Sequence, residues 1–283
     1  MRIVTLYSGS GGNSVYIEAA GEAILIDAGK NARALCNSLS SIGADIGSIK
    51  AIFITHEHND HISALNVLSK RHCIPIHMTE YSAVKFDFMR DAAARERIVR
   101  HDIEYEETVG GMCVRSFRTP HDSLMSVGYR VEFFDAEGKH AIGVATDMGY
   151  VSETVRRSLY GCEAVVLESN HDVEMLEMGS YPYDLKKRIL SKRGHLSNAE
   201  SAELAAELVG GGARGFLLAH LSEENNTPDL ALDAFISAVA SPDVFVAAAA
   251  PDAPTELFLP GRKADKIQEA RNGQCKAVER GNA

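Results

Sequence analysis

Residues 55–61 read Thr-His-Glu-His-Asn-Asp-His, which places three imidazoles and three carboxylate or carboxamide side chains within seven positions. The run follows directly on residues 51–54, Ala-Ile-Phe-Ile, a continuous apolar stretch typical of a strand buried on both faces. Polar groups delivered to the end of a buried strand lose hydration, which costs free energy unless something pairs with them. Because neutral imidazole and carboxylate are good ligands for zinc and its neighbours, the run predicts a metal site rather than a solvated loop.

The sequence around this run alternates β-rich segments with helical patterns. Short runs of β-branched and other apolar residues predict strands, and apolar residues at helical spacing predict helices. Two strand-rich halves with interspersed helices favour one α/β domain, an αββα sandwich of two mixed β-sheets flanked by helices. The predicted strands are 3–7, 15–17, 23–26, 51–54, 114–119, 126–133, 140–145, 164–167 and 215–219, and the predicted helices are 31–42, 182–193 and 198–209. We expect the domain to span residues 1–260, followed by a polar tail at 261–283.

Composition limits the class of protein. The chain has 283 residues, 45% of them apolar, which is enough for a sizeable core without disulfide support. Its formal charge is 29 − 39 = −10, which disfavours nonspecific binding to DNA or to an anionic membrane but allows a local basic groove. The five cysteines are odd in number and scattered, and we find neither a signal peptide nor a membrane span. We therefore expect a cytoplasmic protein.

The run at 55–61 matches the His-x-His-x-Asp-His signature of the metallo-β-lactamase superfamily, which the chain resembles over about residues 1–250. Three further positions, His121, Asp147 and His220, match ligand positions of that superfamily, and each lies just beyond a predicted strand. The resemblance implies two divalent transition-metal ions, with zinc expected first and manganese or iron as alternatives, and a bridging hydroxide as nucleophile. It assigns His56, His58 and His121 to one metal, Asp60, His61 and His220 to the other, and Asp147 to a bridging position, with Asp60 also counted as catalytic.

The resemblance also implies a proton-transfer pair. Glu168 closes the predicted strand 164–167, and His195 precedes the predicted helix 198–209. In tRNA 3′-end-processing ribonucleases of the superfamily, a His-Ser-Thr element at this place pairs with a glutamate, and here Leu-Ser replaces Ser-Thr. We expect His195 to act as a general acid held by Glu168, the alternative being a histidine in a helix-capping loop. His171 either lines the pocket and contacts substrate or is an ordinary surface histidine.

A basic run comes immediately before His195. Most such runs are solvated helix faces, but this one leads to the predicted catalytic edge. At about 100° per residue the five side chains cannot share one face of the predicted helix 182–193, so only some can point toward the site. Lys187 and Lys192 are the predicted substrate contacts. The run consists of Lys186, Lys187, Arg188, Lys192 and Arg193.

Together, residues 8–14, 55–58, 168–172 and 194–198 make the chain similar to the bacterial YycJ/WalJ subfamily. That resemblance implies a phosphodiesterase, specifically a 5′-to-3′ exonuclease acting on single-stranded DNA. From the composition we expect no association with a membrane. A small-molecule hydrolase of esters, thioesters, lactams or cyclic phosphodiesters is the alternative, and it predicts a narrow apolar pocket without a basic track. The absence of a flavodoxin-like partner domain argues against a diiron oxidoreductase. The complete ligand set argues against a binding protein without catalytic activity. The oligomeric state stays open.

Overall fold

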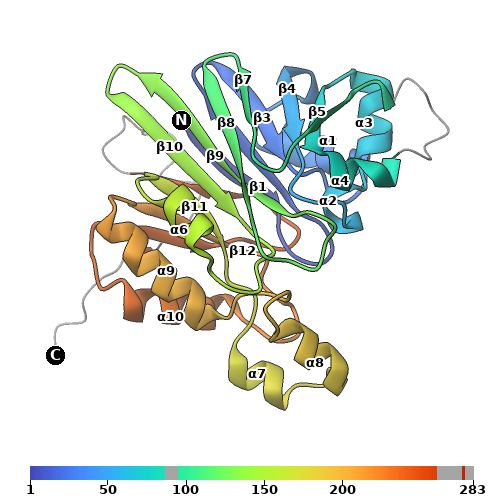
Figure 1. Ribbon diagram of the computed structural model, residues 1–283. Helices are drawn as coiled ribbons and strands as arrows, with labels where there is room; N and C mark the ends of the chain where they lie inside the picture. Colours follow the sequence, from blue (N-terminus) through green and yellow to red (C-terminus); the bar gives the residue numbers. More distant parts are fainter. Residues whose placement is uncertain (87–94, 260–275, 278–283) are drawn as a thin grey trace.

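A computed structural model describes residues 1–86, 95–259 and 276–277, and it contains two sheets packed face to face with helices on their outer sides (Figure 1). The first sheet has the order β14-β1-β2-β3-β4-β5-β6, and the second has the order β15-β13-β12-β11-β10-β9-β8-β7. Both sheets are mixed, because β3 to β6 and β10 to β13 are parallel whereas the other pairs are antiparallel. The predicted αββα sandwich is confirmed.

The strands of the first sheet are β1 (Arg2–Tyr7), β2 (Ser14–Ala19), β3 (Glu22–Ile26), β4 (Ile49–Phe53), β5 (Ile76–Thr79), β6 (Ile98–His101) and β14 (Thr255–Leu257). Those of the second are β7 (Glu106–Val109), β8 (Met112–Arg118), β9 (Val127–Asp135), β10 (Gly138–Ala145), β11 (Ala164–Glu168), β12 (Gly215–Ala219), β13 (Phe245–Ala248) and β15 (Lys276–Ala277). The helices are α1 (Ala32–Ser41), α2 (Asn59–Ile62), α3 (Leu65–His72), α4 (Glu80–Ala83), α6 (Glu153–Leu159), α7 (Val173–Met178), α8 (Tyr183–Ile189), α9 (Asn198–Gly210) and α10 (Pro228–Ala238).

Three buried apolar clusters account for the four layers. The central one joins the inner faces of the two sheets, with Phe53 of β4 and Tyr129 of β9 at edge-to-face geometry and 5.6 Å between ring centroids. A second lies between the first sheet and α1 and α3, where Leu35 and Leu68 are fully buried. A third lies between the second sheet and α6, α9 and α10, and it includes Leu204. Each sheet thus buries both faces, which is why its central strands read as continuous apolar runs.

Several strands and helices were not predicted from the sequence, among them β5, β6, β7, α3, α6 and α10. The strands of this group are only four residues long, and β6 and β7 carry charged, partly exposed residues. A short polar strand has no periodic pattern to distinguish it from a loop, and its neighbours in the sheet stabilise it instead.

The predicted helix 182–193 is too long. Helix α8 ends at Ile189, and the chain then turns, with Gly194 N donating to Ser191 O and His195 N donating to Ile189 O at 3.1 Å. A side chain on Gly194 would overlap the carbonyl oxygens of Arg188 and Ile189, so only glycine fits this turn. As a consequence, Lys192 and Arg193 lie in the turn and not on a helix face. Helices α7 and α8 project from the sandwich as a small arm (Figure 1).

Most of the predicted tail at 261–283 lies outside the described residues. Within it, Lys276 and Ala277 form β15, which pairs antiparallel with β13. No helix in the described part of the chain is both long and apolar enough to cross a lipid bilayer.

Candidate metal centre

The predicted ligands come together at one edge of the sandwich, where strands of both sheets end. The residues after β4 lead through His56 and His58 into the short helix α2, which carries Asp60 and His61. From the second sheet, His121 follows β8, Asp147 follows β10 and His220 follows β12. Strands of similar direction end at the same edge of a sheet, so residues far apart in sequence converge there.

Left-handed backbone turns aim several of these side chains into the centre. Asp147 and His220 both have φ +58°, and Asp27, which follows β3, has φ +63°. L-residues other than glycine adopt this region at an energetic cost, and such residues cluster at functional sites. All three lie within two residues of a strand end. The left-handed conformation therefore occurs just where each strand stops.

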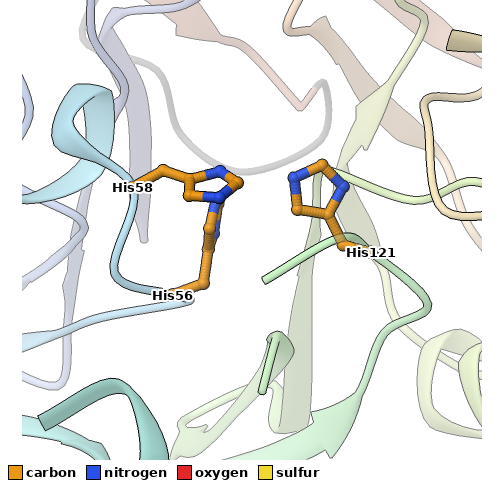
Figure 2. Close-up of side chains that lie close together, drawn as sticks. All are labelled: His56, His58 and His121. Atoms are coloured by element: carbon orange, nitrogen blue, oxygen red, sulfur yellow. The ribbon is translucent and has the colours of Figure 1, made fainter. Parts of the chain in front are cut away.

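His56, His58 and His121 form a first group. One nitrogen from each ring lies within 4.8 Å of the other two, a spacing suitable for ligands of a single ion. Ring centroids are 4.5 Å apart for His56 and His58, 5.1 Å for His56 and His121, and 5.2 Å for His58 and His121. Figure 2 shows the three rings facing a common space from two separate segments of the chain.

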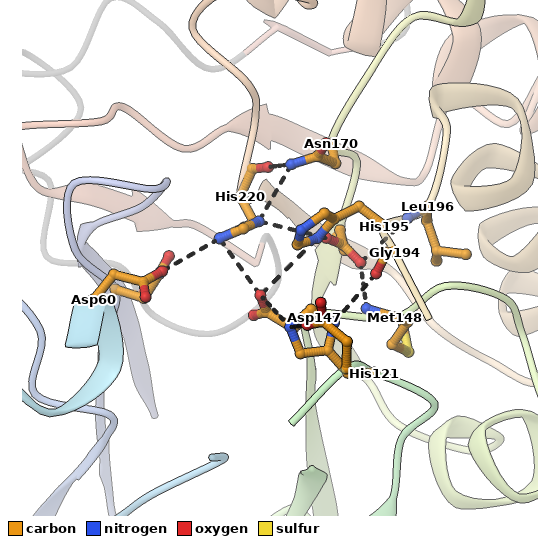
Figure 3. Close-up of polar contacts among 12 residues, drawn as sticks. Asp60, His121, Asp147, Met148, Asn170, Gly194, His195, Leu196 and His220 are labelled. Atoms are coloured by element: carbon orange, nitrogen blue, oxygen red, sulfur yellow. Dashed lines mark hydrogen bonds and ion pairs between the residues drawn. The ribbon is translucent and has the colours of Figure 1, made fainter. Parts of the chain in front are cut away.

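Asp60, His61 and His220 form a second group with the same spacing. Asp147 lies between the two groups: its Oδ2 is 3.4 Å from His61 Nε2, and its Oδ1 is 3.6 Å from His220 Nε2 and 3.8 Å from His121 Nε2. Figure 3 shows its carboxylate at the centre of these contacts. The structure therefore brings together all seven residues that the sequence assigned to metal binding.

Contacts behind the rings fix their orientation. Thr55 Oγ1 donates to Asp27 Oδ2 at 2.8 Å, so at 3.0 Å from His56 Nδ1 it can only accept, which leaves the lone pair of His56 on Nε2. His61 Nδ1 lies 2.8 Å from Asp27 Oδ2. His121 Nδ1 donates to Gly194 O at 3.2 Å. In the neutral rings of His56 and His121, Nε2 is then the nitrogen with a lone pair that can bind a cation.

The charges of the cluster favour a cation. Burial alone would raise the pKa of Asp147, but His220, His61 and His56 hold it well below its ordinary value. Burial alone would lower the pKa of His220, but Asp147, Asp60 and Glu168 raise it to about 10. Burial and the neighbouring histidines lower the pKa of His56 well below its ordinary value. The carboxylates stay ionised and favour positive charge on the groups next to them. A bound divalent ion would provide that positive charge directly.

The predicted pair of His195 and Glu168 is present next to Asp147. His195 Nδ1 lies 2.6 Å from Glu168 Oε1 and 3.9 Å from Asp147 Oδ1 (Figure 3). Glu168 is fully buried, and its Oε2 accepts from the backbone N–H of Met148 at 2.7 Å. Burial would raise the pKa of Glu168, but His195 and His220 lower it to about 2. The helix-capping role belongs instead to Ser197, whose side chain forms a capping box with Glu200.

Of the three residues predicted to contact substrate, one is buried and two are exposed. His171 is only 1% exposed, so it is not a surface histidine, and its backbone pairs with that of Ser197. Lys187 is exposed on α8, and Lys192 is exposed in the turn that follows it. Beside the metal centre is a cavity whose lining includes Arg188 and Arg193 of the basic run and none of these three residues.

Sequence reasoning missed Asp27, Asn13 and Thr55. Asn13 Nδ2 lies 3.2 Å from Asp60 Oδ2 and 3.1 Å from His61 Nε2. The backbone of Gly29 packs so closely on Asp60 that a Cβ there would overlap the Asp60 carbonyl oxygen. A signal for Asp27 existed, since it is a charged residue placed directly after the buried strand β3.

Comparison with known proteins identifies the family. A family model described as the beta-lactamase superfamily domain matches residues 22–221. The chain belongs to the beta-lactamase superfamily. This member is 34% identical over 243 residues to exodeoxyribonuclease WalJ of Streptococcus pneumoniae serotype 2 (strain D39), a match that covers 85% of the chain and 89% of the relative. It is 33% identical over 226 residues to exodeoxyribonuclease YycJ of Bacillus anthracis, covering 80% of the chain and 84% of the relative. The resemblance inferred from the motifs is confirmed.

Solved structures agree on the fold of this superfamily member. The metallo-beta-lactamase fold protein YhfI of Bacillus subtilis aligns with TM-score 0.68 and 17% identity over 90% of the chain and 98% of that protein. The short form of human tRNase Z aligns with TM-score 0.61 and 17% identity over 90% and 98% of the respective chains. At this level of identity the likeness shows the fold alone.

The metallo-β-lactamase fold implies divalent metal ions, and the residues of this superfamily member fit them. Nine buried side-chain atoms of the described residues have no hydrogen-bond partner, and His56 Nε2, Asp147 Oδ2 and His220 Nε2 are three of them. A buried polar atom without a partner is costly, and all three atoms belong to the candidate ligands. The donor set of imidazole nitrogens and carboxylate oxygens is that of zinc and related transition metals.

We predict that Asp27→Asn weakens metal binding about 10- to 100-fold, the range found when a partner behind a metal ligand is removed. Asparagine tolerates the left-handed backbone of Asp27, so the turn is retained while the charge that holds His61 is lost. Metal affinity is measured by competition with a chromogenic chelator. Glu132→Gln, at another buried carboxylate, on strand β9, is the matched control and should leave the affinity unchanged. Equal losses in both variants would contradict a specific role for Asp27.

Proposed function

We propose that the protein is a dinuclear metal-dependent phosphodiesterase that degrades single-stranded DNA as a 5′-to-3′ exonuclease. The observation that carries the proposal is the position of Asp147 between two ligand groups, with the His195–Glu168 pair beside it. The names of the two sequence relatives, both exodeoxyribonucleases, support the choice of substrate. We also propose a cytoplasmic location, in keeping with free thiols at Cys36, Cys73, Cys113 and Cys162.

In this proposal His56, His58 and His121 would hold one ion, Asp60, His61 and His220 would hold the other, and Asp147 lies between the two groups. Two divalent ions so held, zinc in the first instance, would supply Lewis-acid polarisation of the phosphate and activation of water. Asp60 and Asp147 balance the positive charge, and the contacts made by Thr55, Asp27 and Gly194 keep the ring nitrogens aimed inward.

His195 would carry the proton in this reaction. Cleavage of a P–O bond leaves an alkoxide that needs a proton, and general acid assistance is typically worth about 10²–10⁴ in rate. The Glu168 carboxylate, buried and 2.6 Å from Nδ1, accepts the hydrogen of Nδ1 and fixes the ring. Nε2 of His195 is then the atom that delivers the proton to the leaving oxygen.

The function is tested with oligonucleotides labelled at either end and with metal analysis. Protein purified without chelator should contain close to two transition-metal ions per chain and should release nucleotides one at a time from the 5′ end of single-stranded DNA. A metal content that stays at one after reconstitution would contradict the dinuclear site. Cleavage of ester or lactam substrates with no activity on phosphodiesters would support the small-molecule alternative.

We expect His195→Ala to lower turnover on DNA by about 10²–10⁴ while both metals stay bound. A substrate that releases p-nitrophenolate needs little protonation, so the variant should lose much less activity on it. Turnover on the two substrates, compared at saturation, measures the difference. The same loss on both would exclude a proton-donor role for His195.

Lys187 and Lys192, both exposed, are proposed to neutralise phosphates of the strand beyond the cleavage site. Affinity for an oligonucleotide should fall with salt at a log–log slope of about −0.7 per phosphate contact. The double variant Lys187→Ala, Lys192→Ala should bind more weakly and show a flatter slope. Arg33→Ala on α1, at the outer face of the first sheet, is the control. An unchanged slope in the double variant would contradict the contact.

A further inference from the structure

A cavity of about 220 Å³ lies against one side of the metal centre. Its lining includes His121, His195 and His220 but not His56, His58, Asp60 or His61, so it opens on the side of His195. The arm forms one wall, and Leu221 and Ser222, which follow β12, belong to another part of the lining. Ligand pockets range from about 300 to 1,000 Å³, so this volume suits one small unit rather than several.

The arm gives this cavity an aromatic and apolar wall. Tyr181, half-buried in the loop between α7 and α8, lines it together with Leu185 and Ile189 of α8. A tyrosine ring beside aliphatic side chains provides a surface on which a nucleobase can stack, whatever the base. The apolar wall is therefore suited to stacking a nucleobase, whereas metal binding does not require such a wall.

Two basic residues, Arg188 of α8 and Arg193 of the turn after it, line the cavity, and they differ in whether they are paired. Lys186 Nζ donates to the carbonyl oxygens of Glu177 and Gly179, and Arg188 Nε donates to Asp122 at 2.6 Å. Arg193 lines the cavity and, within the part of the chain that is described, makes no ion pair.

The backbone of Arg193 is fixed. A Cβ on Gly149 would overlap the backbone of Lys192 and Arg193, so this turn is packed directly on the residues that follow Asp147. Gly194, the next residue, holds His121 through its carbonyl oxygen at 3.2 Å. The base of the Arg193 side chain is thereby set at a defined position relative to the metal ligands.

We propose that this cavity binds the terminal nucleotide that the reaction releases, with its base against Tyr181 and its own 5′-phosphate at Arg193. The inference rests on the proposed function. In that reaction the oxygen of water bonds to phosphorus, the P–O3′ bond of the terminal nucleotide breaks, and His195 gives its proton to O3′. The leaving nucleotide must therefore lie on the side of His195, and that is the side on which the cavity opens.

The test measures kcat/KM of each protein variant on DNA strands that differ at the 5′ end. Substrates are single-stranded DNA with a 5′-phosphate, the same strand with a 5′-hydroxyl, and the same strand with an abasic 5′-terminal residue. Base–aromatic stacking is worth about 1–3 kcal/mol. Tyr181→Ala should therefore lower kcat/KM roughly 5- to 150-fold on the complete strand, and Tyr181→Phe should retain most of the wild-type value. On the abasic strand, Tyr181→Ala should match the wild type.

Arg193→Ala should lower kcat/KM on the 5′-phosphorylated strand and much less on the 5′-hydroxyl strand, because the charge it neutralises is then missing. Arg33→Ala, on the opposite side of the sandwich, should leave all rates unchanged. A small p-nitrophenyl phosphodiester, which has no terminal nucleotide, tests whether the metal centre of the wild type is active.

Two results separate this inference from the proposed function. If the wild type cleaves neither DNA nor the small phosphodiester, both are overturned. If it cleaves both, but Tyr181→Ala or Arg193→Ala loses the same factor on complete and altered ends, the proposed function stands and the nucleotide site is wrong.

Discussion

The structure depends on buried carboxylates that need a positive partner. Asp147 and Glu168 are almost completely buried at the edge where strands of both sheets end, and Asp27 lies behind them. A carboxylate removed from water is costly unless charge and hydrogen bonds compensate it. Histidines from four segments of the chain surround these groups. Against the effect of burial, the carboxylates raise the pKa of His220 to about 10. A divalent cation would satisfy the whole set at once.

The need to bring these buried carboxylates and histidines together accounts for strained or tightly packed backbone around them. Asp27, Asp147 and His220 adopt left-handed conformations that cost energy in an isolated chain. They persist because the sandwich around them is closely packed, with three buried clusters that fix each strand end. Gly29, Gly149 and Gly194 allow backbones to meet where any side chain would collide. The packing of the layers thus stabilises left-handed conformations that the local sequence alone would not adopt.

The scaffold also separates the candidate metal centre from the projecting arm. The ligand groups and the His195–Glu168 pair are held by strand ends of the sandwich, whereas the cavity next to them takes one wall from the projecting arm. The turn after α8 connects the two parts, since it carries Arg193, holds His121 through Gly194 and delivers His195. A change in the arm can therefore alter what binds without moving the ligands.

The sequence by itself determined the fold class and the candidate ligands. The buried strand before residues 55–61 and the His-x-His-x-Asp-His spacing are local features, so their meaning does not depend on distant residues. His121, Asp147, Glu168, His195 and His220 were found because each lies at or just beyond a strand end, or because the family pattern marks the place.

The tertiary structure alone decided what lies behind and beside them. Asp27 acts through a contact across 34 positions with His61, and no periodic pattern encodes such a contact. The end of α8 at Ile189, which moved Lys192 and Arg193 off a helix face, followed from packing of Gly149 and Gly194 and not from helix propensity. Local pattern fixes which residues a strand delivers, but only the packing of separate segments fixes which of them meet.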